Sequence, residues 1–168
     1  MTELVVVHRA VGFEEFFRLH FLSLTRLAGL LGADDPQDVA QEALARLHAR
    51  RGGLRDPQAA AAYVRSTVCN LSRSRLRHLG VTRRHAPRLV PVAGAGPEES
   101  AIDSDESRRV LSALAVLPRR QREVLTLRYW MELSEQQIAD SLGISAGSVK
   151  THASRGLAAI ERQLEEDS

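Results

Sequence analysis

The chain of 168 residues has one cysteine, few aromatic residues and no long apolar run. The single Cys69 excludes a disulfide framework within the chain and suits a reducing cytosol, where it is expected to be a small core residue. Aromatic residues make up only 4% of the sequence, and the many Ala and Leu residues favour helices over a β-sandwich or barrel. The apolar patch near the N-terminus has only four residues, too few for a signal peptide or a membrane span. We therefore expect a soluble cytoplasmic protein without membrane insertion.

Acidic residues are missing from the segment between Pro57 and Pro97, whereas arginines are frequent in it. The whole chain is close to neutral, with 23 Lys and Arg, 21 Asp and Glu and a net charge of +2. Acidic residues return in the segments that follow. A locally basic segment in a nearly neutral chain predicts attraction to a polyanion such as a nucleic acid.

Helix signals divide the chain into regular segments. Asp35-Pro36 and Asp56-Pro57 each combine an N-cap carboxylate with proline at the first helical position, and Pro118 opens a further helix. With the apolar period, these signals predict helices at 12–31, 36–50, 58–79, 106–116, 118–131, 134–142 and 145–164. Several Pro and Gly residues and the loss of the apolar period predict a flexible linker at 80–105. The predicted fold is therefore all-α, with two small helical domains at 12–79 and 106–164.

The segment from Ser134 to Ile160 has the pattern of a helix-turn-helix. Ser134 and Gln137 have the spacing of a capping box, and Gly143 stands where a helix end favours a left-handed residue. The apolar residues of the two helices are expected to face inward: Ile138, Ala139, Leu142, Ile144, Val149, Ala153, Leu157 and Ile160. The side chains expected on the outer side of the second helix are Ser148, Lys150, Thr151, Ser154 and Arg155. Short hydroxyls and cations suit base edges and phosphates in a major groove, whereas an ordinary helical hairpin would only expose them to solvent.

The predicted helix at 58–79 has two different faces. Val64, Val68 and Leu71 form its apolar stripe. The side chains on the opposite face are Tyr63, Ser66, Asn70, Arg73, Ser74 and Arg77. An aromatic ring, an amide and arginines suit a single strand with unstacked bases, because the ring stacks, the amide bonds a base edge and the arginines hold phosphates. A solvated arginine-rich face is the alternative on these residues alone.

The predicted helix at 36–50 carries acidic residues at its N-terminal end. Asp34, Asp35, Asp38 and Glu42 gather there, and Gln41 adds a polar group. Val39, Ala43, Leu44 and Leu47 are expected to pack inward. An acidic helix end beside a basic helix indicates a basic protein partner; simple complementation of the helix dipole would explain the same residues.

Together these segments resemble the extracytoplasmic-function sigma factors of the sigma-70 family, most closely the sigma-E group of high-GC Gram-positive bacteria. The resemblance covers about residues 12–79 and 107–164. FEEFFRLHFLSLTRLAGLLG resembles the first helix of sigma region 2, and DDPQDVAQEALARLHAR the acidic helix that docks on polymerase. DPQAAAAYVRSTVCNLSRSRLRH resembles the helix that melts the minus-ten element. LPRRQREVLTLRYWMELSEQQIADSLGISAGSVKTHASRGLAAI resembles region 4, which binds the minus-thirty-five element. Many relatives have Trp at the position of Tyr63 and an acidic residue at that of Ser74.

The resemblance implies a set of partners and site residues. Asp35, Asp38, Gln41 and Glu42 would bind core RNA polymerase at the clamp of the beta-prime subunit, and region 4 would contact the flap of the beta subunit. Tyr63, Asn70 and the loop 51–56 would capture unstacked minus-ten bases, while Lys150, Thr151, Ser154 and Arg155 would contact duplex DNA. An anti-sigma factor is a further candidate partner, since many members of the family have one.

Two other classes of function are compatible with parts of the sequence. A helix-turn-helix regulator would bind duplex DNA as a symmetric dimer without polymerase. A helical metalloenzyme would need the spacing Glu-x-x-His, HExxH or a cysteine cluster, and the sequence has none of them. We therefore expect no enzymatic activity, no metal and no cofactor.

Overall fold

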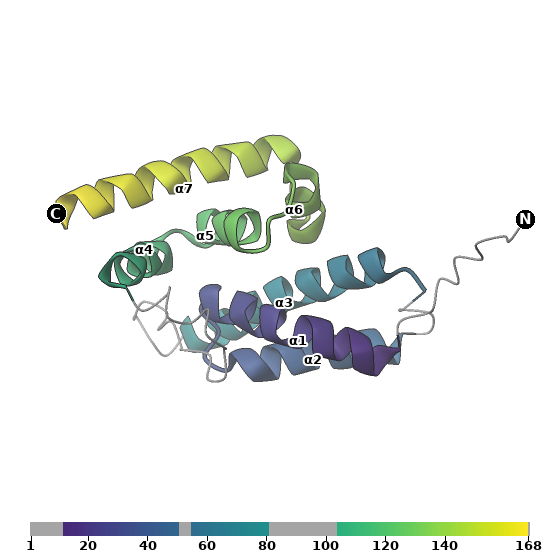
Figure 1. Ribbon diagram of the computed structural model, residues 1–168. Helices are drawn as coiled ribbons and strands as arrows, with labels where there is room; N and C mark the ends of the chain where they lie inside the picture. Colours follow the sequence, from purple (N-terminus) through teal and green to yellow (C-terminus); the bar gives the residue numbers. More distant parts are fainter. Residues whose placement is uncertain (1–11, 51–54, 81–103, 168) are drawn as a thin grey trace, which may run out of the picture.

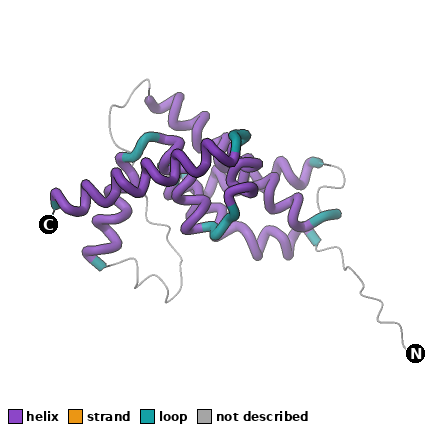
Figure 2. Tube along the Cα trace, turned by 90° about the horizontal axis from the view of Figure 1, so that it is seen from above, coloured by secondary structure: helices purple, strands orange, loops and turns teal. Residues whose placement is uncertain are grey.

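The computed structural model describes residues 12–50, 55–80 and 104–167, and these ranges contain helices and turns but no strand (Figures 1 and 2). The elements are α1 (Phe13–Leu30), α2 (Pro36–Ala49), α3 (Pro57–Gly80), α4 (Asp105–Val116), α5 (Arg119–Leu125), η2 (Thr126–Trp130), α6 (Glu135–Leu142) and α7 (Ala146–Glu166). The predicted all-α fold is confirmed. The predicted linker falls mostly on residues outside the described ranges, so the proposed domain boundaries stay predictions.

The helices α1, α2 and α3 pack against one another and form what we call the N-terminal unit. Asp35 caps α2 by accepting a hydrogen bond from the backbone N–H of Asp38 at 3.1 Å, with Pro36 at the start of the helix. Asp56 caps α3 in the same way, through the N–H groups of Gln58 and Ala59. Both predicted caps are therefore confirmed. The predicted inward residues of α2 and α3 are buried: Val39, Ala43, Leu44, Leu47, Val64, Val68 and Leu71.

The helices α4 to α7 form the C-terminal unit, in which α7 packs on α4, α5 and α6. Ser134 and Gln137 make both hydrogen bonds of the capping box at the start of α6. Gly143 ends that helix in the left-handed region, with φ 65°. Ser145 then caps α7 through the N–H of Ser148. The predicted helix, turn and second helix are thus present.

The helix predicted at 118–131 differs from the structure. Pro118 is the N-cap, α5 begins at Arg119, and the last turns widen into the π-helix η2. The backbone N–H of Met131 bonds the carbonyl of Thr126 at 3.3 Å, five residues back, and Glu132 takes the left-handed φ of 53°. A π turn is set by packing in the folded chain and has no clear mark in the apolar period.

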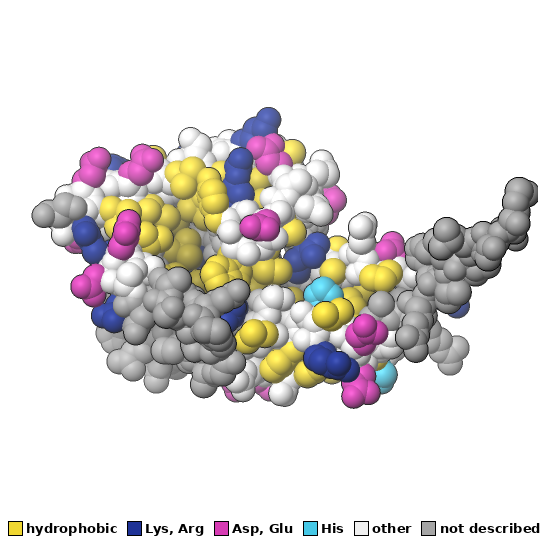
Figure 3. Space-filling view, viewed as in Figure 1, with side chains coloured by type: hydrophobic (Ala, Val, Ile, Leu, Met, Phe, Trp, Pro, Cys, Tyr) yellow, Lys and Arg dark blue, Asp and Glu magenta, His cyan; other side chains and the backbone are white. Residues whose placement is uncertain are grey.

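One predicted inward residue, Leu157, is 37% exposed, whereas Val149 and Ala153 are buried. Helix α5 meets α7 at Gly156, and a residue one position further along lies about 100° around the helix. Leu157 therefore lies at the margin of the contact. With Val110 and Val116 of α4 it belongs to the large apolar side chains that stay exposed, and Figure 3 shows apolar side chains gathered on the face that α4 and α7 present.

Substituting Gly156 by Ala is expected to destabilise the fold by about 1–3 kcal/mol, because overpacking a close helix contact forces its neighbours to shift. A Cβ at this position would lie 2.9 Å from Cδ1 and 3.2 Å from Cγ of Leu125. Gly147→Ala is the matched control, since its Cβ would meet nothing nearer than the Ser145 Oγ at 3.9 Å. Chemical denaturation should show a lower midpoint for the first variant only; equal midpoints would contradict the close approach.

The N-terminal and C-terminal units also pack against each other. α3 contacts α6, and α1 contacts η2 (Figure 1). The buried apolar side chains of both units form one continuous cluster. Within the part of the chain that the structure describes, no helix has the length and apolar character needed to cross a membrane.

Candidate nucleic-acid and polymerase interfaces

The outer side of α7 presents most of the residues predicted for duplex DNA. Lys150, Thr151, Ser154 and Arg155 are exposed. The Lys150 ammonium lies 3.7 Å from a carboxylate oxygen of Glu135 at the start of α6. Ser148 is half-buried and shares a hydrogen bond of 2.9 Å with the hydroxyl of Ser145. The face therefore offers one hydroxyl-bearing side, two cations and a capped helix start.

The face of α3 predicted for unstacked bases remains largely accessible. Asn70 and Arg77 are exposed, and Ser66 and Ser74 are half-buried. The ring of Tyr63 is half-buried, and the Arg50 guanidinium lies 4.4 Å from its centroid. This cation–π contact places a phosphate-binding group beside an aromatic ring that could stack on a base. The predicted capture loop falls partly outside the described residues, because the structure describes only Arg55 and Asp56 of it.

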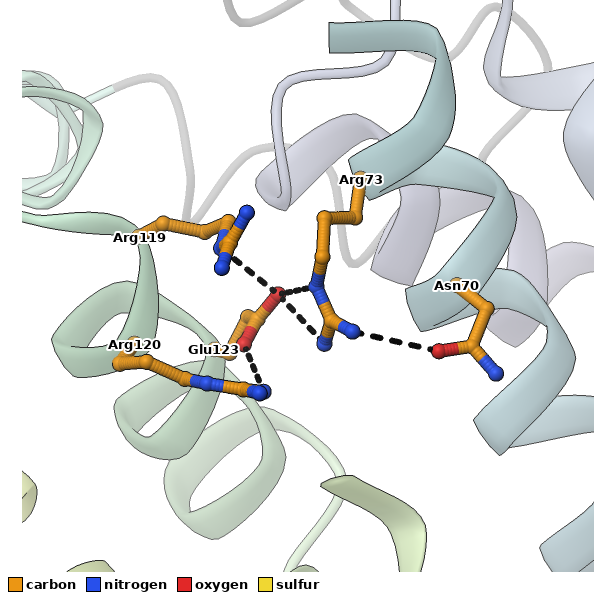
Figure 4. A network of polar contacts seen from close by, with 5 residues as sticks. All are labelled: Asn70, Arg73, Arg119, Arg120 and Glu123. Carbon is orange, nitrogen blue, oxygen red and sulfur yellow. Dashed lines mark hydrogen bonds and ion pairs between the residues drawn. The ribbon is translucent and has the colours of Figure 1, made fainter. Parts of the chain in front are cut away.

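Arg73 differs from its neighbours on α3, because it is bound to the C-terminal unit. Its Nε and Nη2 donate to Oε1 of Glu123 in α5 at 3.1 and 3.0 Å, and its Nη1 donates to the Asn70 side-chain oxygen at 3.3 Å (Figure 4). The Glu123 side chain is only 3% exposed, and Arg120 and Arg119 approach it at 2.9 and 3.9 Å. Sequence analysis missed this network. The spacing of Arg119, Arg120 and Glu123 within one helix indicates a local ion pair, but nothing in it points to α3.

The acidic end of α2 is also bound within the protein. Arg75 of α3 donates to Glu42 at 2.9 Å and pairs with Asp38 at 2.5 Å, and Arg46 pairs with Glu42 at 2.7 Å. Partial burial lowers the pKa of Arg75, but its bonds to Asp38 and Glu42 outweigh that effect and raise the pKa overall. The carboxylates nevertheless keep exposed surface. Asp35 and Gln41 are exposed beside them, so the four predicted polymerase-binding residues lie on one accessible helix end.

Cys69 is buried at 1% exposure in α3, as predicted for a core residue. Burial is the largest cause that raises the pKa of its thiol from 9.0 to about 12, and Glu123 adds to this effect, while Arg73 and Arg120 oppose it. A protonated, inaccessible thiol reacts slowly, because the thiolate is the nucleophile. No cluster of three or more His, Cys, Asp or Glu suited to a metal occurs in the described ranges.

We expect Cys69 to resist alkylation at pH 8 in the native chain and to react fully in denaturant. Its raised pKa also predicts a pH effect: above about pH 9 the unfolded thiol ionises while the folded one does not, so stability falls as pH rises towards 12. Mass spectrometry after a timed alkylation tests the first statement, and denaturation at pH 8 and 10 the second. Rapid labelling of the native thiol would contradict its burial.

Comparison with known proteins identifies the family. The model of sigma-70 region 4 matches residues 107–160. The chain is 34% identical to the RNA polymerase sigma-E factor of Streptomyces avermitilis, over 91% of this chain and 85% of that protein. It is also 34% identical to the sigma-E factor of Streptomyces coelicolor, over 90% and 85% of the two chains.

Solved structures share the fold. The sigma factor RpoE of Bartonella quintana, in complex with the anti-sigma factor NepR, matches with a TM-score of 0.71 at 21% identity, covering 93% of this chain and 98% of RpoE. CnrH in complex with the cytosolic domain of CnrY matches with a TM-score of 0.66 at 24% identity, covering 93% and 89%. The extent of the sequence identity confirms the resemblance stated above: the chain belongs to the sigma-70 family of RNA polymerase sigma factors, in the extracytoplasmic-function group, and serves transcription initiation.

Proposed function

We propose that the chain directs core RNA polymerase to promoters by binding the minus-thirty-five element with α7 and the opened minus-ten element with α3. The observation that carries this proposal is the two-sided character of α7. Val149 and Ala153 are buried on one side, while Lys150, Thr151 and Arg155 are exposed on the other. A capped helix with hydroxyls and cations on its free side fits the major groove of a duplex.

The opened strand would be held by the exposed face of α3. Tyr63 can stack on a base, Asn70 can bond a base edge, and Arg77 can hold a phosphate. Binding sites that exist only for extruded bases favour the melted state of the promoter, because they add binding energy to that state alone. The chain would therefore stabilise opening without catalysing a reaction; the nucleotide chemistry belongs to the polymerase.

Two protein surfaces support binding to polymerase in the cytoplasm. The acidic end of α2, with Asp35, Asp38, Gln41 and Glu42, is suited to a basic surface such as the beta-prime clamp. The apolar side chains exposed on α4 and α7 are suited to an apolar segment such as the beta flap. RpoE and CnrH were solved with NepR and CnrY, and we propose that an anti-sigma protein binds this chain as well.

The test of the proposal is transcription in vitro. The chain is mixed with core RNA polymerase and a library of genomic fragments, and transcript starts are sequenced. We expect specific starts that need the chain and share sequence elements upstream. If the chain instead binds duplex sites as a dimer and never supports initiation, a conventional helix-turn-helix regulator is the correct assignment.

Arg155→Ala is expected to weaken binding to the minus-thirty-five duplex by about 1–3 kcal/mol, the loss typical of one base contact. Arg162→Ala is the control, because Arg162 is an exposed arginine on the same helix whose Nε bonds the Ala158 carbonyl at 3.3 Å. Fluorescence anisotropy with wild-type and base-substituted duplexes measures both affinity and specificity. Equal affinities of the two variants would remove Arg155 from the DNA-binding face.

A further inference from the structure

We propose that the chain can close on itself, with Glu123 of the C-terminal unit binding Arg73 of the N-terminal unit, and that the two units must separate before both bind one promoter. This inference rests on the proposed function, because it concerns the same two DNA-binding faces. It adds a self-inhibiting contact that the chain carries within its own sequence.

The contact has the chemistry of a competitor for DNA. Arg73 lies on the face of α3 proposed for the opened strand, and Glu123 offers it a carboxylate oxygen at 3.0 and 3.1 Å. A guanidinium binds carboxylate and phosphate oxygens with the same donors, so Arg73 cannot hold both. With side-chain exposures of 16% and 3%, this pair is screened little by salt.

The network in Figure 4 is built so that Glu123 can release Arg73. Arg120 binds the second oxygen of Glu123 at 2.9 Å from within the same helix, and Arg119 lies 3.9 Å away. When the units separate, Glu123 keeps these two partners, and no unpaired buried carboxylate is left behind. Arg73 then becomes available for a phosphate.

Other contacts hold the same closed arrangement. The guanidinium of Arg26 in α1 lies 5.9 Å from the ring centroid of Trp130 in η2. α3 packs on α6, and the apolar cluster runs through both units. Trp130 is 39% exposed, so the aromatic contact is only partly shielded from water. The two units therefore touch through one buried ion pair and a modest apolar area, as expected for domains that separate.

The closed arrangement is too short for a promoter. The two elements lie about 25 base pairs apart, which is about 85 Å along a straight duplex at about 34 Å per ten base pairs. A compact chain of this length is only about 40 Å across, from a radius of gyration of about 15 Å. A closed chain therefore cannot place α3 and α7 on both elements at once.

The closed population should lower apparent affinity for polymerase. If the holoenzyme needs the open arrangement, the apparent dissociation constant is the intrinsic one divided by the open fraction. Weakening the contact between the units should therefore tighten polymerase binding, even though it removes a side chain from the DNA-binding face. A residue that only supported the fold would have the opposite effect.

The test uses Arg73→Gln in the full chain, because this variant leaves Glu123 paired with Arg119 and Arg120. Arg162→Gln is the control of equal charge change. Spin labels at Glu15→Cys in α1 and Glu106→Cys in α4, both exposed positions, report the distance between the units by pulsed electron resonance. Titration of unlabelled variants with core polymerase measures the second quantity, and the alkylation rate of Cys69 is a third.

We expect one short distance for the wild type and Arg162→Gln, and an added population at longer distance for Arg73→Gln. The same variant should bind core polymerase about 5- to 10-fold more tightly and expose Cys69 several-fold faster. Unchanged distances, or an unchanged polymerase affinity, would overturn the proposal. Because the distances are measured on the chain alone, this result is independent of whether transcription in vitro succeeds.

Discussion

Replacing Asp38 and Glu42 together by Ala is expected to weaken binding to core RNA polymerase by about 2–5 kcal/mol, while duplex DNA binding by the chain alone stays unchanged. The magnitude is that of truncating buried, hydrogen-bonded charges at a protein interface. Both carboxylates lie on the accessible end of α2 and keep exposed surface in spite of their ion pairs. Affinity for fluorescently labelled core polymerase and anisotropy with duplex DNA measure the two properties.

Arg75→Gln separates binding from structure in this prediction. Asp38 and Glu42 hold Arg75 of α3, so their removal also leaves that guanidinium without partners. Arg75→Gln breaks the same ion pairs but keeps both carboxylates, and it should retain or improve polymerase affinity. If Arg75→Gln loses as much affinity as the double variant, the acidic end of α2 serves only to join α2 to α3.

The second large effect is expected at Tyr63. Tyr63→Ala should reduce promoter opening by about 1–3 kcal/mol, the free energy of stacking one base on an aromatic ring. Tyr63→Phe should open the promoter as well as the wild type, because it keeps the ring and its contact with Arg50 at 4.4 Å. Permanganate reactivity of minus-ten thymines in the polymerase complex measures the opened fraction.

The half-buried position of Tyr63 calls for a second measurement. Thermal unfolding of both Tyr63 variants shows whether the alanine variant has lost stability. Loss of opening in a chain with near-normal unfolding assigns the ring to the strand. Equal opening by Tyr63→Ala and Tyr63→Phe would mean that Tyr63 has no base to stack on.

Local signals predicted the parts of the fold that depend on local chemistry. The caps at Asp35 and Ser134 and the left-handed Gly143 each involve hydrogen bonds or dihedrals within a few residues. Their side chains act on the nearest backbone groups, so the sequence order is enough to find them. The helices and the outer face of α7 followed from these caps and the apolar period.

The remaining features depend on contacts between distant residues. Arg73 and Glu123 are 50 positions apart, and Arg75 and Glu42 are 33 apart. An arginine on a polar helix face has the same pattern whether it faces solvent, DNA or a carboxylate from another helix. The π-helix before Glu132 and the exposure of Leu157 likewise depend on how α5 meets its neighbours. None of these could be predicted without the packing of the whole chain.

The most direct test of the account maps both helices on one promoter. A DNA-cleaving iron chelate is attached to Gly147→Cys at the start of α7 or to Ala59→Cys at the start of α3, both exposed positions beside the proposed faces. The native Cys69 can stay, because it is buried. In the polymerase complex, the probe at 147 should cut duplex DNA near minus thirty-five. The probe at 59 should cut about 25 base pairs downstream, and only where the strands have opened. Cleavage of one common duplex segment by both probes would contradict the account.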